Sequence, residues 1–511
     1  MTFGEALGLI MLFSMVAVIF IGFPVSFTLL FLAVIFGGLG LGWDSTFNLA
    51  YLQIWGTMKD EIFPAVPLFI FMGYMTEQAG LMERLFRSLR SLLAFLRGSL
   101  YLAVILTATI FAMATGIVGA AVTILGIMAG PVMIKAGYDA RLSSGAIAAG
   151  GTLGILIPPS VMLVVMGPVM GVPVNLLYSA AFGPGFLLAG CYVAYALTRS
   201  FINPRLGPAM TMEERKSTYD EMTTEKVRAP VVGLALVCLV VMVYLVADLL
   251  LSGVGAPPLR FTIGQLTISG VASLLALLLA FPYFRNAYFR GVVLGIAPLS
   301  VLIGFTLGTI VGGLATPTEA ASCGAFGAAL LALIYGRLDM KSATNAAIGT
   351  MVTSAMVLFL AVASTVFGAI FTKLGSANFI TNSLIALPLG DWWKLSLIMF
   401  VFFVLGWPFE WPVIILVFLP IVLPVIERLQ FGLSKLDLLI WVGALIAVNM
   451  QTSYLSPPVA MSAYYLRNVV PQWGLATIYR GMSDYMVIQV IILILLLLFP
   501  QIALWLPNLV R

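Results

Sequence analysis

The sequence contains no histidine in its 511 residues, and charged residues make up only 9% of it. Without histidine, histidine-based acid–base catalysis and the HExxH zinc signature are excluded. No Gly-Lys pair occurs, so a Walker A nucleotide loop is excluded as well. Soluble proteins carry about a quarter charged residues, whereas 62% of this chain is hydrophobic. We therefore expect an integral membrane protein and exclude a disordered, collagen-like or nucleic-acid-binding chain.

Cysteine and N-terminal basic residues are also scarce. Cys191, Cys238 and Cys323 each lie in an apolar run, without metal-ligand spacing and without the pattern of a disulfide framework. The first basic residue is Lys59, and the apolar stretch 7–42 is too long for the hydrophobic region of a signal peptide. We therefore expect the first helices to stay in the membrane.

Long apolar stretches predict the membrane-spanning helices, because a helix needs about 20 apolar residues to cross a bilayer. The long candidates are 4–23, 24–42, 66–82, 176–198, 229–250, 261–281, 291–314, 317–336, 344–371 and 484–508. Four further stretches are interrupted: 99–134 at Thr115-Gly116, 143–171 at Pro158-Pro159, 393–426 at Gly406-Trp407-Pro408, and 436–466 at Pro457-Pro458. Interrupted backbone is tolerated in lipid only where protein, ions or water pair its polar groups. We predict an all-α polytopic protein with two re-entrant hairpins, 99–134 and 393–426, and two broken helices, 143–171 and 436–466.

The distribution of Lys and Arg predicts the orientation, because cytoplasmic loops are enriched in these residues. We place the N-terminus outside, let 99–134 enter from the cytoplasm and let 393–426 enter from the outside. All but seven of the 25 basic residues then lie on the cytoplasmic side. The exceptions are Lys59, Arg260, Lys373, Lys394, Arg428, Lys435 and Arg511. We predict that both termini are periplasmic.

The segment 83–97 is amphipathic and is expected to form a helix that lies flat on the cytoplasmic face of the membrane. A solvated loop is the alternative. Its arginines recur at roughly helical spacing: Arg84, Arg87, Arg90 and Arg97. The hydrophilic segment 199–228 is the longest in the chain, and we expect it to link two halves.

Matched motifs indicate an internal duplication. Three pairs of landmarks recur at nearly one offset: LIPPSVM at 156–162 and LSPPVAM at 455–461 (299 residues), Pro24 and Pro317 (293 residues), and Gly116 and Gly406 (290 residues). In the topology above, the spans after Pro24 and Pro317 run in opposite directions, so the repeat is inverted. The predicted halves are 1–199 and 291–511, separated by a cytoplasmic linker and an extra helix pair at 200–290. Inverted repeats with paired broken helices indicate a secondary transporter.

The motifs also resemble those of a known family, the large membrane subunit of tripartite ATP-independent periplasmic (TRAP) transporters. The similar stretches are GGTLGILIPPSVM, GGLATPTEAASCGAFGA, NMQTSYLSPPVAMSAYYLRNV, AVPLFIFMG and LGWPFEW…LPIVLPV. They cover most of the chain except 200–290. The resemblance implies an elevator-type transporter that is driven by a sodium gradient, fed by a periplasmic substrate-binding protein and completed by a small helical membrane subunit. Since the chain starts with the large subunit's first helices, we expect the small subunit to be a separate polypeptide.

Hairpin tips and helix breaks expose the oxygen atoms that a hard cation needs. With Na⁺ as the coupling ion and no other cofactor, we expect one ion site at the first tip and break and another at the second tip and break. The expected ligands are Thr115, Gly116, Gly119, Gly154, Gly406, Glu410, Thr452 and Ser456. The resemblance implies Asp near the second hairpin tip in many family members, and this sequence has Glu410 there in GWPFEW. Small residues at the tips could instead serve close helix packing, and the proline pairs could be structural kinks.

The second break is far more polar than the first. Polar side chains inside an apolar span are costly unless they are used, so we expect substrate contacts to come mainly from the second half. The expected substrate-binding residues are Asn449, Gln451, Ser453 and Ser160. Glu319, which closely follows Pro317, is expected to compensate the positive end of a helix.

Together these features predict Na⁺-coupled uptake of a small organic anion, with carboxylates favoured by the family resemblance, across a bacterial or archaeal inner membrane. A stand-alone ion-coupled carboxylate transporter without a binding protein is the alternative. An intramembrane enzyme or a channel is a third possibility. We do not expect an enzyme, because the chain has no histidine and no Lys or Asp placed beside a Ser within one span.

The orientation can be tested by cysteine labelling in a cysteine-free background. We expect Ser217→Cys to react only from the cytoplasmic side, and Thr2→Cys and Arg511→Cys only from the periplasmic side. The excess of basic residues on one side is the physical reason. Labelling of position 217 from outside intact cells would contradict both the orientation and the hairpin assignment.

Overall fold

The computed structural model describes residues 2–116, 118–224, 286–456 and 460–511, and within these residues the chain is helical without β-strands. Nine segments of this part are long and apolar enough to cross a membrane. The prediction of an all-α, multi-pass membrane protein is therefore confirmed. The predicted helix pair 229–281 and the second proline pair, Pro457-Pro458, lie outside the described residues.

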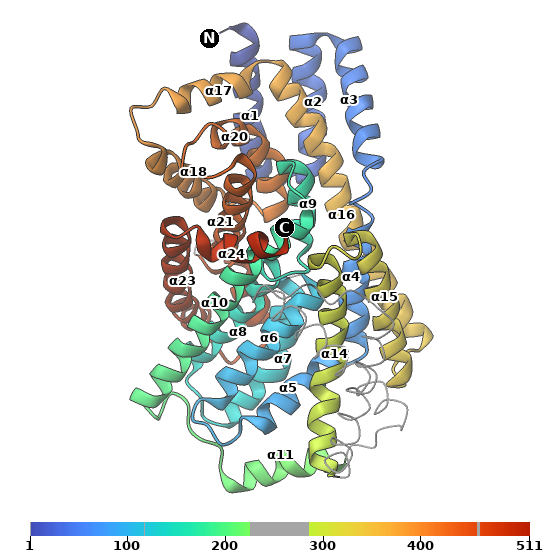
Figure 1. Ribbon diagram of the computed structural model, residues 1–511, viewed down its shortest axis with the longest axis vertical. Helices are drawn as coiled ribbons and strands as arrows, with labels where there is room; N and C mark the ends of the chain where they lie inside the picture. The colour runs from blue at the N-terminus through green and yellow to red at the C-terminus, as the bar shows by residue number, and fades with distance from the viewer. Residues whose placement is uncertain (1, 117, 225–285, 457–459) are drawn as a thin grey trace.

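The first three helices and α16 stand together at one end of the molecule (Figure 1). They are α1 (Phe3–Ile21), α2 (Val25–Leu41), α3 (Trp43–Met58) and α16 (Met340–Lys373). Their outer faces expose large aromatic side chains such as Phe13 and Phe31, which suits contact with lipid. The sequence did not predict α3, because polar residues such as Asp44 interrupt its apolar pattern. Gly42, with φ +85°, separates α2 from α3 and lets the chain reverse.

The amphipathic segment predicted at 83–97 forms α5 (Leu81–Leu92), which ends earlier than expected. Its apolar face is covered by protein, since Leu85 is fully buried and Ser88 lies against Gly295 of α14 (Ala287–Val311). The Arg84 guanidinium lies 4.5 Å from the centroid of the Tyr335 ring. The face that was expected to meet lipid therefore packs on neighbouring helices.

Helix α15 (Pro317–Ile334) packs along α4 (Ala65–Gln78) and begins at a capping box. The Glu319 carboxylate accepts hydrogen bonds from the Thr316 backbone N–H at 2.8 Å and from the Thr316 hydroxyl at 2.9 Å. Glu319 thus stabilises the start of a helix, as expected.

Each of the four interrupted stretches is divided between helices. The first hairpin stretch holds α6 (Ser99–Thr115) and α7 (Val118–Lys135), and the first broken stretch holds α8 (Ala140–Leu156) and α9 (Val161–Met170). The second hairpin stretch holds α18 (Asp391–Leu405), α19 (Trp411–Val413), the π-helix η1 (Ile414–Phe418) and α20 (Leu419–Ile426). The second broken stretch holds α21 (Lys435–Leu455) and α22 (Met461–Val469). Among the described residues, the second hairpin stretch contains the one π-helix, η1, and such π-helical turns are frequent at functional sites.

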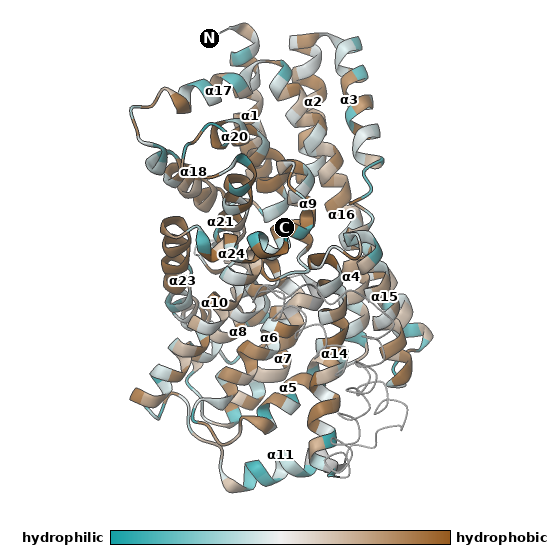
Figure 2. Ribbon diagram, viewed as in Figure 1, coloured by the Kyte–Doolittle hydropathy of each residue, from teal (hydrophilic) through white to brown (hydrophobic). Residues whose placement is uncertain are grey.

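One expectation for the longer segments is wrong. The stretch 484–508 is not one span: α23 (Leu475–Leu498) starts earlier, and α24 (Gln501–Val510) follows after Pro500, which has no N–H to continue a helix. In the hydrophilic segment 199–228, α10 (Val174–Ile202) extends into the first residues and α11 (Met212–Thr224) follows. Figure 2 shows α11 as a largely hydrophilic helix at the lower end of the molecule, whereas α23 is strongly hydrophobic. A further short helix, α17 (Ser376–Ile385), connects α16 to the second hairpin stretch.

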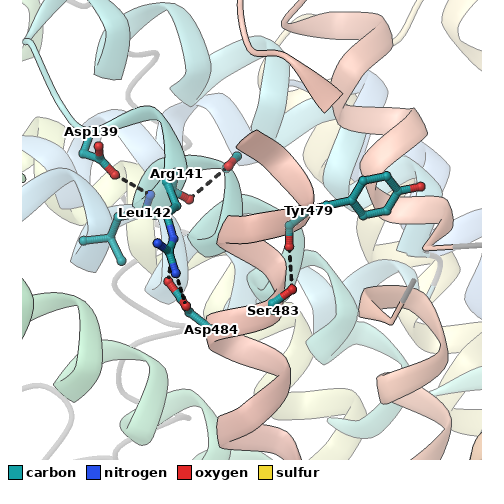
Figure 3. Close-up of polar contacts among 7 residues, drawn as sticks. Asp139, Arg141, Leu142, Tyr479, Ser483 and Asp484 are labelled. Atoms are coloured by element: carbon teal, nitrogen blue, oxygen red, sulfur yellow. Dashed lines mark hydrogen bonds and ion pairs between the residues drawn. The ribbon is translucent and has the colours of Figure 1, made fainter. Parts of the chain in front are cut away.

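Helices α8 and α21 form the buried centre of the molecule. Every residue from 142 to 156 in α8 and from 438 to 455 in α21 is buried. Each helix is held at its first turn by an ion pair. Arg141 binds Asp484 of α23 through two hydrogen bonds, at 2.6 and 3.1 Å (Figure 3), and Asp437 binds Arg511 at 2.6 Å. Near the first pair, Gly145 and Gly481 allow α8 and α23 to approach closely, because a Cβ on either residue would overlap the other helix.

The ion pair between Arg141 and Asp484 should be detectable by charge exchange. We expect Asp484→Arg to lower the Tm of the purified protein, because it places two cations together, and Arg141→Asp in the same chain to restore most of the loss. The Arg141 side chain is 46% exposed, so the attraction is worth only about 0.2–1 kcal/mol. Glu61→Arg, at an exposed carboxylate without an ion pair in the described chain, is the control. Equal losses in the single and double variants would contradict a specific pairing.

Candidate functional site

The tip of the first hairpin stretch lies against the first helix break. Gly116 joins α6 and α7 with φ +61°, a conformation that favours glycine. A Cβ on Gly116 would be 3.4 Å from the backbone nitrogen of Val161 and 3.7 Å from the carbonyl oxygen of Pro159. Thr115 is the last residue of α6, and Gly154 is buried in the last turn of α8. The tip at Gly116 therefore lies against the break, Gly154 precedes the break in the last turn of α8, and an ion site formed by these residues stays a prediction.

Ser160, expected to bind substrate, is fully buried in the first break and is used by the protein. Its hydroxyl donates to the carbonyl oxygen of Ile155, and its own carbonyl accepts a hydrogen bond from the Tyr178 hydroxyl at 3.4 Å. Gly119 lies one turn beyond the tip, where a Cβ would be 3.0 Å from the Tyr465 ring of α22. Gly119 thus connects the first hairpin stretch to the second broken stretch rather than to the first break.

The tip of the second hairpin stretch lies against the end of α21. A Cβ on Gly406 would overlap the Ser453 side chain, 2.7 Å from its Cβ. The Trp407 indole N–H donates to the Ser456 hydroxyl at 3.1 Å, and the Asn449 amide N–H donates to the carbonyl oxygen of Met399 at 2.7 Å. Residues 449, 453 and 456 are spaced by four and three, so they share the face of α21 that looks at α18 and the tip.

Two oxygen atoms on this face have no hydrogen-bond partner in the described chain. They are the Asn449 Oδ1 and the Ser453 Oγ, and both are buried. A buried oxygen without a partner is rare and costs about 1–3 kcal/mol. Two such atoms lie one helical turn apart on the face of α21 that packs against α18 and the tip, and they are suited to bind a cation or water. Thr452 differs, because its hydroxyl donates to the Asn449 carbonyl oxygen at 2.5 Å.

Glu410 supplies the one acidic side chain of this site. It is half-buried just before α19 and forms no ion pair with any described residue. Tyr454 and Tyr465 lie within electrostatic range of its carboxylate. Tyr465 also packs against Gly119, so it contacts the first hairpin stretch while lying within electrostatic range of Glu410 in the second. The sequence analysis missed both tyrosines, and their only signal was their position on either side of the polar break.

Gln451, the remaining expected substrate ligand, points away from the hairpin tips. Its amide N–H donates to the carbonyl oxygen of Thr152 in α8 at 3.1 Å, and its side-chain oxygen accepts a weak hydrogen bond from Gln489 of α23 at 3.5 Å. Both ends of the carboxamide are therefore engaged by the protein, and the side chain is fully buried.

The ends of α8 and α21 have the same local geometry. Helix α8 closes with a hydrogen bond from Ile157 N–H to the Leu153 carbonyl at 2.9 Å, and α21 closes with one from Ser456 N–H to the Thr452 carbonyl at 2.8 Å. Both C-terminal residues are extended, with φ/ψ of −77°/123° at Ile157 and −86°/129° at Ser456. The two bonds are separated by 299 residues, which is the offset between the two proline motifs.

A family model described as "Tripartite ATP-independent periplasmic transporter, DctM component" matches residues 12–502. The chain belongs to this family. The resemblance found in the motifs is thereby confirmed.

Three similar proteins align with this chain over nearly their whole lengths. The chain is 26% identical to the sialic acid TRAP transporter large permease protein SiaM of Vibrio cholerae, covering 98% of each chain. It is 25% identical to the C4-dicarboxylate TRAP transporter large permease protein DctM of Pseudomonas aeruginosa, covering 91% of this chain and 90% of the relative. It is 23% identical to the ectoine TRAP transporter large permease protein TeaC of Halomonas elongata, covering 98% and 99%. These relatives are permeases, not enzymes.

The YdaH transporter of Alcanivorax borkumensis is a solved structure with a similar fold. It superposes with a TM-score of 0.55 at 16% sequence identity, covering 93% of this chain and 96% of that chain. At this identity the similarity shows a shared fold alone. Family membership, by contrast, makes the chain a multi-pass component of a secondary transporter for organic acids, of the kind that works with a small membrane subunit and a periplasmic binding protein.

The contact between the second tip and α21 predicts a specific steric coupling. We expect Gly406→Ala to lower the Tm, because the new Cβ overlaps Ser453 and such overpacking costs about 1–3 kcal/mol. Ser453→Gly in the same chain removes the overlapping atoms and should recover part of the loss. Gly368→Ala on α16, where a Cβ meets nothing within 4 Å, is the matched control. If Ser453→Gly lowers the Tm of the Gly406→Ala variant further instead of raising it, the tip does not pack against α21 at Ser453.

Proposed function

We propose that this TRAP permease couples Na⁺ entry to the uptake of a small organic anion delivered by a periplasmic substrate-binding protein. One observation carries the proposal: the buried, unpartnered oxygens of Asn449 and Ser453 lie one turn apart on the face of α21 that packs against α18 and, at Ser453, against the second hairpin tip. Such oxygens suit a hard alkali cation, which takes several oxygen ligands. Glu410, a carboxylate without a cationic partner in the described chain, would supply part of the compensating charge.

The proposed second ion site uses the tip and the face of α21 turned towards it. Gly406 and Glu410 would contribute from the tip, and Ser456 from the break. Asn449 and Ser453, first expected to bind substrate, fit an ion-binding role better because each has a buried oxygen without a partner in the described chain, on the face of α21 that meets α18 and the tip. Thr452 would contribute through the lone pairs of its hydroxyl, which remain available while it donates to a carbonyl.

The proposed first ion site is made of backbone oxygens. Gly116 at the first tip lies against the break at 157–160, and we propose that the carbonyl oxygens of Thr115, Gly116 and Gly154 contribute to the site. Helix ends leave their last four carbonyls without helical partners, so oxygen ligands are available without a charged side chain. Ser160, whose hydroxyl and carbonyl are both used internally, is proposed to shape the site that receives the substrate.

The substrate is proposed to be a carboxylate. The names of the relatives give C4-dicarboxylate, sialic acid and ectoine as transported compounds, and all three carry a carboxyl group. The N-terminal ends of α9 and α22 provide the positive ends of helix dipoles next to the breaks. Bound Na⁺ would add positive charge, so an anion would bind more tightly after the ion.

We also propose an inverted-repeat architecture and an elevator-type movement, and the packing between the two halves supports both. Each hairpin stretch packs against the broken stretch of the other half, since α7 contacts α22 while η1 and α20 contact α9. This reciprocal packing would let the hairpins and breaks move as one body against α1–α4 and α14–α16. The inner membrane, with both termini periplasmic, is the proposed location, and the small subunit is proposed to be a separate polypeptide.

The test is uptake of radiolabelled C4-dicarboxylate, sialic acid and ectoine into proteoliposomes containing this permease and its small subunit. We expect uptake only with an inward Na⁺ gradient, not a K⁺ gradient, and only with the binding protein present. Ser453→Ala removes one oxygen, and losing such a ligand is worth about 1–2 kcal/mol, so it should raise the half-saturating Na⁺ concentration roughly tenfold. Ser396→Ala, at an exposed hydroxyl on α18, is the control.

Two outcomes would contradict parts of this proposal. Equal uptake with Na⁺ and K⁺ gradients would show that Na⁺ is not the coupling ion. Full uptake by the permease without a binding protein would favour the stand-alone carboxylate transporter instead.

A further inference from the structure

The point where α8 and α21 meet contains a fully buried polar cluster away from the hairpin tips. Gln451 of α21 bonds the Thr152 carbonyl of α8 and accepts a hydrogen bond from Gln489 of α23. The Tyr192 hydroxyl of α10 faces the side chains of Thr152 and Gln489 but forms no hydrogen bond within the described chain. All four side chains are completely buried. A polar cluster of this kind, in the centre of an apolar membrane protein, is costly unless it has a use.

The cluster joins equivalent positions of the two halves. Thr152 and Gln451 are 299 residues apart, the same offset that relates the proline motifs and the closing hydrogen bonds of α8 and α21. In a two-fold arrangement, a residue that contacts its own counterpart lies at the axis. The hydrogen bond from Gln451 to Thr152 therefore marks the point about which the two halves are related.

Thr152 and Gln451 each lie one helical turn before the break that follows their own helix. Helix α8 ends four residues after Thr152, at Leu156, and α21 ends four residues after Gln451, at Leu455. At 1.5 Å per residue, either break is about 6 Å from the contact along its helix. The two broken stretches also pack on each other elsewhere, α8 against α22 and α9 against α21. The hydrogen bond from Gln451 to Thr152 is the directed polar contact between α8 and α21.

We propose that Gln451 is a positioning residue that couples the two ion-binding breaks, an inference that rests on the proposed Na⁺ function. An ion bound at the first break fixes the last turn of α8 and with it the Thr152 carbonyl. Through Gln451 this also fixes the last turn of α21, which carries Asn449 and Ser453. Binding at one break then favours binding at the other, and by linkage the effect is reciprocal.

The neighbouring contacts explain why this side chain, rather than general packing, would carry the effect. Gln451 cannot rotate towards the hairpin tips without leaving its own amide, the Gln489 amide and their partners unpaired in an apolar interior. The two ends of its carboxamide therefore hold one orientation. Around it, α8 is fixed to α23 by the close approach of Gly145 and Gly481, so movement of α8 is passed on rather than absorbed.

The experiment measures uptake against Na⁺ concentration in proteoliposomes containing the permease, its small subunit and the binding protein. Gln451→Met keeps the length and volume of the side chain and removes both hydrogen bonds. We expect the Hill coefficient for Na⁺ to fall from about 2 to about 1, because two coupled sites become independent. Gln53→Met on α3, distant from both breaks in the chain, is the matched control and should keep the unmutated value.

The outcomes separate this inference from the function on which it rests. Uptake that is independent of the Na⁺ concentration in the unmutated protein would overturn the proposed function itself. Na⁺-dependent uptake with an unchanged Hill coefficient in Gln451→Met, even at a reduced maximal rate, would show that Gln451 only packs helices and would overturn the coupling. If Gln451→Met does not fold, Gln489→Met decides, because it frees one end of the Gln451 carboxamide. A lowered Hill coefficient in Gln489→Met would support the coupling, and an unchanged one would overturn it.

Discussion

The structure depends on one constraint, the requirement that backbone N–H and C=O groups inside a membrane find partners. An unbroken helix satisfies it automatically, and most of the long spans of this permease do so. The four interrupted stretches do not, and the molecule is arranged around them. Their ends are covered by each other, by hairpin tips and by the fully buried helices α8 and α21. The backbone atoms exposed by these interruptions are also the atoms available to an ion.

The charged residues are distributed so that this centre stays almost neutral. The ion pairs that hold α8 and α21 lie at the first turns of these helices, far along the chain from the breaks. Near the breaks the polar groups are hydroxyls, amides and carbonyls, and Glu410 is the one carboxylate described there. Neutral dipoles of fixed orientation can favour a cation in one place and an anion in another without the large desolvation cost of buried charges. A site of this kind can release its cargo as readily as it binds it.

Contacts between the halves give the two breaks a common framework. The first hairpin stretch reaches α22 through Gly119 and Tyr465, and the second reaches α9 through η1. The contact of Thr152 with Gln451 closes the arrangement at its centre. Because packed protein interiors are stiff and transmit strain, these reciprocal contacts are the physical basis on which coupling between the two breaks is proposed.

The sequence by itself determined the class of protein, the four interruptions and the family, because composition, proline pairs and glycine tips are local features that packing does not alter. It could not determine which residues of the polar run at 449–456 face which neighbour. Successive residues on a helix point about 100° apart, so Asn449 faces α18 and Ser453 faces the hairpin tip, while Gln451 faces α8. The covering of α5 by α14 and the contact of Tyr465 with Gly119 were likewise decided by tertiary structure. In each case the reason is the same: an apolar membrane sequence specifies that a helix is buried, but the neighbour that buries each face is chosen only when the helices pack together.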